Sequence, residues 1–370
     1  MGHGIAQISA MAGYNVKLRD IKEEFLDNAM EKIRWSLSKM VKKNKITPQE
    51  ESSILSRITP VVDMNDALNN SDLVIEVVPE NMDIKRKVYA ELDSIAAPDT
   101  IFASNTSTLP ITEIAKTTNR KDMVIGVHFF NPPQLMKLVE VIPGADTSSH
   151  ITEVMENFVK ALGKTPVICR RDVPGFIINR LFIPMVHEAL YMMERQNISK
   201  EVVDSSVRFH MGFPMGIFEL ADFTGLDVIH KASNEMFSRD KKVLRQHPTI
   251  QQLFEENKLG QKSGEGFYMY SDTKYERIEL SVELADKCNP IDIIANITNN
   301  AAWLITNNVS NTVEIDKATA LGLGLKISLF ETAKNTGIQK IIDSLNNLTR
   351  QHGQFYEPDP FLRTLAENSE

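Results

Sequence analysis

Two segments of the sequence carry side chains suited to acid–base chemistry. Residues 103–109 (Ala-Ser-Asn-Thr-Ser-Thr-Leu) are rich in hydroxyl groups and follow a strand-like run. Residues 127–133 (Val-His-Phe-Phe-Asn-Pro-Pro) bring His128 to the end of the next such run, and Glu140 lies inside the apolar run 138–142. A carboxylate is rarely buried without a partner, and a histidine beside a carboxylate makes a base that works near neutral pH. The pattern predicts a His128–Glu140 base.

The elements that must position these residues alternate between β-rich runs and amphipathic helical stretches. This rhythm is typical of a parallel α/β sheet, in which ligands bind at the carboxyl ends of the strands. A long charged stretch, residues 21–43, is predicted to be helical. The expected strands are residues 16–20, 73–78, 101–105, 124–130, 138–142 and 166–169.

The N-terminus has the pattern of the second half of a dinucleotide-binding βαβ unit. Residues 1–6 (Met-Gly-His-Gly-Ile-Ala) begin a helix that leads into a strand ending at Asp20. An acidic residue there accepts the ribose hydroxyls of NAD and repels the 2′-phosphate of NADP, so NAD is the predicted cofactor. The first strand and first two glycines of the motif do not precede Gly2 and Gly4. We therefore expect Met1 to be an internal methionine taken as a start, or the chain to be truncated.

The second half of the chain changes character. A helical pattern begins after residues 174–175 (Pro-Gly) and continues to about residue 347, interrupted by a turn and extended piece at 264–270. A shift of 112 residues superimposes many positions without a gap, among them Asp204 on Asp316 and Gly212 on Gly324. This regularity predicts a duplicated helical domain whose second copy is degenerate.

Composition limits the classes of protein that remain. The chain has 370 residues, 41 Lys and Arg, 49 Asp and Glu, and a net charge of −8, which argues against nucleic-acid binding. Its length suggests two or three domains. Only Cys169 and Cys288 are present, which excludes a disulfide scaffold and a Cys-rich metal site and favours a cytoplasmic protein. No run approaches the roughly 20 apolar residues that span a bilayer, so we expect no membrane association.

Taken together, the motifs resemble the L-3-hydroxyacyl-CoA dehydrogenase family over nearly the whole chain. The resemblance implies an α/β Rossmann-type NAD-binding domain at 1–173 with its first strand missing. An all-α domain at 174–272 and a second, degenerate copy of it at 290–370 would follow. The segments that carry the resemblance are residues 1–6, 104–107, 128–132, 137–140, 174–180, 214–219 and 264–268.

The resemblance also implies roles for individual residues. His128 would take the proton of the 3-hydroxyl group as a hydride leaves C3 for the nicotinamide, and Glu140 would orient its imidazole. Ser107 would hydrogen-bond the 3-oxygen, and Asn179 would bind the thioester end of the acyl-CoA substrate. Cofactor contacts are implied for Gly2, Asp20, Glu80, Lys85, Ser107, Asn131 and Lys262, and contacts to the coenzyme A nucleotide for Ser36 and Lys43.

Ordinary structural roles stay open for several of these residues. His128 could be satisfied by local hydrogen bonds, and Asn179 could cap a helix. Glu80 could equally cap the helix expected to start at residue 81, where an acidic group suits the helix dipole. Ser36 and Lys43 could be ordinary surface residues.

Three further expectations concern partners and function. A second helical copy within one chain would occupy the surface through which two-domain members dimerise, so we expect a monomer or a weak homo-oligomer. A functional contact with a separate enoyl-CoA hydratase is a further expectation. Two alternatives to an NAD-dependent 3-hydroxyacyl-CoA dehydrogenase stay open, namely a hydroxy-acid dehydrogenase similar to L-gulonate 3-dehydrogenase and a non-catalytic scaffold similar to lambda-crystallin.

Overall fold

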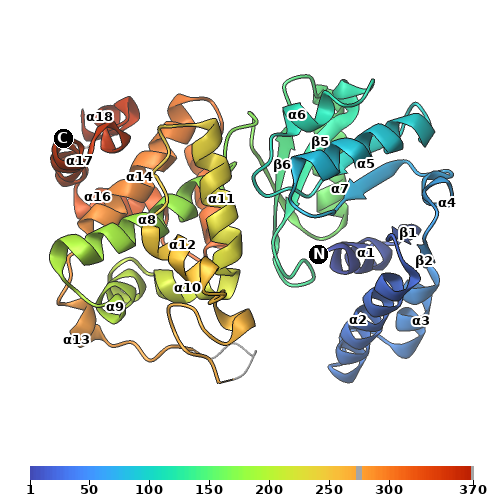
Figure 1. Ribbon diagram of the computed structural model, residues 1–370, viewed down its shortest axis with the longest axis horizontal. Coiled ribbons are helices and arrows are strands. Elements are labelled where there is room, and N and C mark those ends of the chain that lie inside the picture. The colour runs from blue at the N-terminus through green and yellow to red at the C-terminus, as the bar shows by residue number, and fades with distance from the viewer. Residues whose placement is uncertain (272–276, 368–370) are drawn as a thin grey trace. The chain divides into compact units, whose positions relative to one another are not determined.

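The chain folds into two compact units, Met1–Asp172 and Val173–Glu370 (Figure 1). We describe a computed structural model that covers residues 1–271 and 277–367. The predicted domain boundary at residue 272 lies outside these residues. Unit 1 is α/β and unit 2 is all-α among the described residues, in agreement with the predicted fold class.

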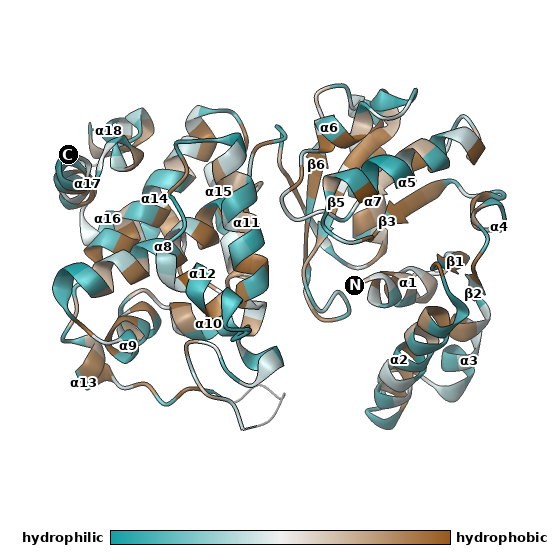
Figure 2. Ribbon diagram, in the orientation of Figure 1, coloured by the Kyte–Doolittle hydropathy of each residue, from teal (hydrophilic) through white to brown (hydrophobic). Residues whose placement is uncertain are grey.

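The strands of unit 1 form two separate sheets. In the smaller sheet, β1 (Val16–Arg19) pairs in parallel with β2 (Ile58–Val61). The larger sheet has five strands in sequential order. They are β3 (Leu73–Glu76), β4 (Ile101–Ser104), β5 (Val124–Phe129), β6 (Leu138–Pro143) and β7 (Thr165–Ile168). Several of these strands, among them β3 and β6, are mostly hydrophobic in Figure 2, as expected for a sheet covered on both faces. Their charged residues are Glu76 in β3 and Glu140 in β6.

The six predicted strands are confirmed, and two features differ from the prediction. The short β2 was missed because Pro60, which cannot donate a ladder hydrogen bond, made this segment unlike a strand. The sheet is also not wholly parallel, because β6 runs antiparallel to β5. The connection between these two strands is too short for a parallel crossover, which needs a dozen or more residues.

Helices pack on these sheets through regular apolar faces. One face of α1 contributes Ile5 and Ile8 to the core of the large sheet, and another contributes Ala6 and Ala10 to a second core. Helix α2 completes the second core with residues spaced at helical intervals. The helices of unit 1 are α1 (Gly2–Met11), α2 (Glu23–Lys42), α3 (Pro48–Ser56), α4 (Met64–Leu68), α5 (Met82–Ile95), α6 (Ile111–Ala115), α7 (Ser149–Ala161) and the 3-10 turn η1 (Lys121–Met123).

Unit 2 is a helical array. Its elements are α8 (Ile178–Gln196), α9 (Lys200–His210), α10 (Ile217–Thr224), α11 (Leu226–Arg239), α12 (Pro248–Glu255), η2 (Gln261–Ser263), α13 (Val282–Ala285), α14 (Ile291–Thr306), α15 (Thr312–Gly322), α16 (Leu329–Thr336), α17 (Ile338–His352), η3 (Gln354–Tyr356) and α18 (Pro360–Glu367). The bounds of α9, α10 and α12 recur 112 residues later in α15, α16 and α18. In the part of the chain described here, no helix is long and apolar enough to cross a membrane.

Candidate active site

The central pair of the site is held by two neighbouring strands. In the antiparallel register of β5 and β6, His128 lies opposite Glu140, and His128 Nδ1 is 2.7 Å from Glu140 Oε2. The side chain of His128 is 9 % exposed and that of Glu140 is fully buried. Because a carboxylate only accepts hydrogen bonds, Nδ1 carries the proton and Nε2 is the ring nitrogen that can take a proton from a ligand. The predicted pairing is therefore present in the fold.

The turn that carries Ser107 is joined to the same strand. It begins where β4 ends, and the side-chain oxygen of Asn105 accepts a hydrogen bond from the backbone N–H of Phe129 at 2.9 Å. Thr106 closes the turn, since its hydroxyl oxygen accepts from the N–H of Leu109 at 2.8 Å. Asn105 thus ties the Ser107 turn to the residue after His128.

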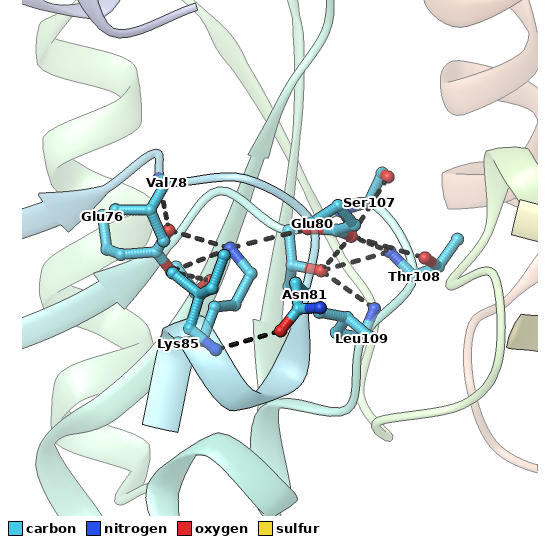
Figure 3. Close-up of polar contacts among 11 residues, drawn as sticks. Glu76, Val78, Glu80, Asn81, Lys85, Ser107, Thr108 and Leu109 are labelled. Atoms are coloured by element: carbon cyan, nitrogen blue, oxygen red, sulfur yellow. Dashed lines mark hydrogen bonds and ion pairs between the residues drawn. The ribbon is translucent and has the colours of Figure 1, made fainter. Parts of the chain in front are cut away.

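The carboxylate of Glu80 holds this turn through several hydrogen bonds (Figure 3). Its Oε1 accepts hydrogen bonds from the Thr106 hydroxyl at 2.5 Å, the Ser107 N–H at 3.0 Å and the Thr108 N–H at 3.2 Å. Although burial raises the pKa of Glu80, Lys85 and these donors outweigh it, so the pKa lies below its usual value. Asn81 caps α5 through the Ile84 N–H, so Glu80 does not act as that cap.

Lys85 lies beneath the turn in a buried ion pair. Its ammonium group is 2.8 Å from Glu76 Oε1 and 3.5 Å from Glu80 Oε2, and its side chain is 1 % exposed. Glu76 was not singled out from the sequence, although an acidic residue ending an apolar strand was a signal of the kind that identified Glu140. The structure brings the predicted cofactor residue Lys85 into contact with Glu76 and Glu80.

The remaining predicted cofactor positions of unit 1 lie at element ends. Gly2 is the first residue of α1, whose start has no side-chain cap, and Asp20 follows β1. Asn131 lies in the loop after β5. This loop approaches α1 closely at Gly4, since a Cβ atom on residue 4 would lie 2.6 Å from the side chain of Pro133. These groups fit a dinucleotide, since uncapped helix N–H groups suit a diphosphate and a carboxylate at a strand end suits ribose hydroxyls.

The predicted nucleotide residues of coenzyme A lie on one helix. Ser36 is in α2 and Lys43 follows its last residue. Sequence reasoning missed two neighbours: Lys39, which shares the face of Ser36 and Lys43 at helical spacing, and Trp35. Trp35 is 62 % exposed, and the Lys39 ammonium lies 3.5 Å from its ring centre. The spacing of 36, 39 and 43 in the sequence was the available signal for Lys39.

Two predicted residues belong to unit 2. Asn179 is the second residue of α8, and Lys262 lies in η2, where it forms an ion pair with Asp227. The loop beyond Lys262 is held by Asp222, whose carboxylate accepts from the N–H groups of Phe267 and Tyr268, each at 2.9 Å. Within unit 1 the structure joins Ser107, Glu80 and Lys85 in one cluster and His128 and Glu140 in a pair. The hydrogen bond between Asn105 and Phe129 links the segments that carry them. Asn179 and Lys262 lie in separate elements of unit 2.

Comparison with known families accounts for nearly the whole chain. The model of the 3-hydroxyacyl-CoA dehydrogenase NAD binding domain matches residues 1–173. The model of the 3-hydroxyacyl-CoA dehydrogenase C-terminal domain matches residues 175–270 and 292–370. Unit 1 is therefore an NAD-binding domain.

Individual relatives agree with these matches. The chain is 43 % identical over 278 residues to the human mitochondrial hydroxyacyl-coenzyme A dehydrogenase, covering 73 % of this chain and 88 % of the relative. It is 40 % identical over 273 residues to a probable 3-hydroxybutyryl-CoA dehydrogenase of Deinococcus radiodurans, covering 73 % and 96 %. The 3-hydroxybutyryl-CoA dehydrogenase structure from Escherichia coli has a TM-score of 0.88 at 28 % identity, covering 100 % of this chain and 96 % of that one. The chain thus belongs to the 3-hydroxyacyl-CoA dehydrogenase family.

Proposed function

We propose that this protein oxidises the 3-hydroxyl group of an (S)-3-hydroxyacyl-CoA to the 3-keto thioester with NAD. The observation that carries the proposal is the 2.7 Å contact between His128 Nδ1 and the buried carboxylate of Glu140. This geometry fixes the tautomer of the ring and prepares Nε2 to act as a base. When bound, NAD supplies the acceptor for the hydride that leaves C3.

Residues of this chain transfer the proton of the 3-hydroxyl group and bind its oxygen. His128 Nε2 takes the proton of the 3-hydroxyl group, and the Glu140 carboxylate stabilises the imidazolium that results. Ser107 hydrogen-bonds the 3-oxygen while its charge changes. In the reverse direction His128 returns the proton to that oxygen. Asn179 binds the thioester end of the substrate through a neutral amide, which adds no charge to the site.

Cofactor and coenzyme A contacts follow from charge and position. Gly2 and Asn131 would meet the cofactor near the start of α1, Asp20 would accept its ribose hydroxyls, and Glu80 and Lys262 would complete its site. Ser36 and Lys43 would hold the phosphates of coenzyme A. The exposed Lys39 and Trp35 on the same helix support that placement, because they offer a cation and an aromatic surface to a nucleotide.

We further propose that residues 174–272 and 290–370 are copies of one helical domain. The recurrence of helix bounds at an interval of 112 residues supports this, as does the positive φ of Gly212 and Gly324, which is 74° at both. The second copy would cover the dimer surface of the first, so the protein would be a monomer or a weak homo-oligomer that contacts an enoyl-CoA hydratase only transiently. Its two buried free thiols fit a cytoplasmic location.

An assay of NADH oxidation with acetoacetyl-CoA tests the proposed function. We expect turnover that depends on both compounds, and little turnover of NAD with L-gulonate. Preference for the free hydroxy acid would favour a hydroxy-acid dehydrogenase. No turnover with either substrate would favour a scaffold without catalysis.

A further inference from the structure

The ammonium group of Lys85 is enclosed by carboxylates. Its Nζ lies 2.8 and 3.0 Å from the two oxygens of Glu76 and 3.5 Å from Oε2 of Glu80 (Figure 3). An ammonium group has three N–H donors, and these three oxygens match them. With its side chain only 1 % exposed, Lys85 is placed to bind protein carboxylates rather than to meet a ligand directly.

Glu76 anchors this arrangement to the sheet. It ends β3, and its carboxylate accepts further hydrogen bonds from the Val78 N–H at 2.6 Å and the Ser104 hydroxyl at 2.7 Å. Both oxygens are therefore bound to groups of the sheet and of the chain that leaves it. A lysine paired with such an anchored carboxylate is itself held in one position.

Glu80 connects the buried pair to the surface. Its side chain is 28 % exposed, and its two oxygens face different partners. Oε2 approaches Lys85, while Oε1 receives the hydrogen bonds of the turn that carries Ser107. Without the lysine, Glu80 would face the negative charge of Glu76 across the same space, and solvent would become its better partner.

We propose that Glu76 and Lys85 are positioning residues that act on Ser107 through Glu80. The buried pair keeps Glu80 turned toward the backbone of the Ser107 turn, and this fixes where the Ser107 hydroxyl is presented. The inference rests on the proposed function, in which Ser107 contacts the 3-oxygen. It also gives Lys85 a role that differs from direct contact with the cofactor.

The kinetic test uses Lys85→Met and Ser107→Ala, alone and combined. We expect each single substitution to lower kcat for acetoacetyl-CoA about 10- to 100-fold with little change in the KM for acetoacetyl-CoA, as displaced catalytic groups do. In the Lys85→Met background, Ser107→Ala should lower kcat by less than about threefold, because residues acting as a unit are not additive. Losses that multiply independently would overturn the proposal. Lys116→Met, which removes an exposed lysine paired with Glu113, is the control.

A second measurement does not depend on activity. Amide hydrogen exchange at Ser107 and Thr108 should accelerate in Lys85→Met and in Glu80→Gln, whereas Phe129, bonded to Asn105, should keep its rate. Unchanged exchange at 107 and 108 in Lys85→Met would refute the positioning role of the buried pair. If Lys85→Met does not fold, Glu76→Gln decides the outcome, because it removes the charge that holds Lys85 and keeps the size of the side chain. Exchange at 107 and 108 should accelerate in this variant, and an unchanged rate would refute the positioning role. An inactive wild type with the expected exchange changes would refute the proposed function and keep the positioning role.

Discussion

At the scale of single residues, the chemistry depends on a carboxylate with no exposure to solvent. Glu140 lies in the middle of an apolar strand, where it is paired with His128. Burying a carboxylate costs several kcal/mol unless it is paired, so this placement reflects the needs of the imidazole rather than of the sheet. The nearby Cys169 thiol is also buried. Its own burial, and secondly the charge of Glu140, raise its pKa, so the thiol stays protonated.

The first prediction concerns this carboxylate. Glu140→Gln should lower kcat for acetoacetyl-CoA reduction by about 10² or more, because an amide holds the ring but does not stabilise the imidazolium. The KM for acetoacetyl-CoA should change little, since Glu140 is not proposed to touch the substrate. Steady-state kinetics, with a thermal melt to verify folding, provide the check. A variant that retains wild-type kcat would show that the pair has only a structural role.

A second prediction concerns the lysine at the end of α2. Lys43→Ala should raise the KM for acetoacetyl-CoA about fivefold, the equivalent of about 1 kcal/mol for an exposed ion pair, and should leave kcat unchanged. With acetoacetyl-pantetheine, which lacks the nucleotide, wild type and variant should have equal KM values. Lys160→Ala, an exposed lysine of α7 paired with Glu156, serves as the control. Equal KM values for acetoacetyl-CoA would place the nucleotide elsewhere.

The sequence alone was sufficient to predict the pair His128 and Glu140, because a charged residue within an apolar run demands a partner. It was not sufficient to predict the partners of Lys85. The contact of Lys85 with Glu80 spans a helix start, and its contact with Glu76 joins α5 to β3, so both depend on the path of the chain between the elements. Such contacts have no periodic signal in the sequence.

At the scale of elements, hydrophobic runs identified the strands of the large sheet but not the direction of β6. The short connection between β5 and β6 favours the antiparallel direction of β6. A hydrophobic run has the same pattern in a parallel and in an antiparallel strand. This direction matters for the site, because the antiparallel register puts Glu140 directly across from His128. The small β2 escaped prediction because of Pro60, which is tolerated at a sheet edge.

The helices of unit 2 contain a histidine that must stay neutral. His187 of α8 donates from Nε2 to the Ser233 hydroxyl at 2.7 Å, because that hydroxyl itself donates to the Ile229 carbonyl at 2.6 Å. Its Nδ1 accepts from the His247 N–H at 3.4 Å. A second ring proton would meet a donor, and complete burial, together with the charge of His247, lowers the pKa of His187 to about 3.

This arrangement predicts a pH-dependent stability. The folded pKa lies below that of the unfolded chain, so the stability that His187 contributes is present above about pH 6.5 and is lost as pH falls from there toward 3. The destabilisation caused by His187→Gln should therefore be smaller at pH 5.5 than at pH 7.5, by about 1.4 kcal/mol. Urea unfolding at both pH values measures the difference. A pH-independent effect of His187→Gln would contradict the assignment.

At the scale of the whole molecule, unit 1 has a sheet in two parts. Among the described residues, β1 pairs with β2 and β3 pairs with β4, and no strand pairing joins the two sheets. The dinucleotide motif places a strand and a Gly-x-Gly turn ahead of α1. The sequence predicted the family, because the motifs that follow Gly2 occur in the expected order.

A prediction at this scale uses an extended chain. Placing a β-rich segment that ends in Gly-x-Gly-x before Met1 should tighten NADH binding about tenfold or more, equivalent to about 1.4 kcal/mol, because the added turn would supply N–H groups to the diphosphate. Fluorescence titration of NADH against both chains measures this. A segment of equal length without the glycines is the control. Equal affinity of all three chains would show that the strand and turn are dispensable.

The central claim is that His128 is the base of the reaction. The most direct test compares kcat of the wild type and His128→Gln for NADH oxidation with saturating acetoacetyl-CoA. The account predicts a loss of about 10²- to 10⁴-fold with NADH affinity unchanged, because only the proton transfer is removed. A His128→Gln variant within a few-fold of wild-type kcat would contradict it.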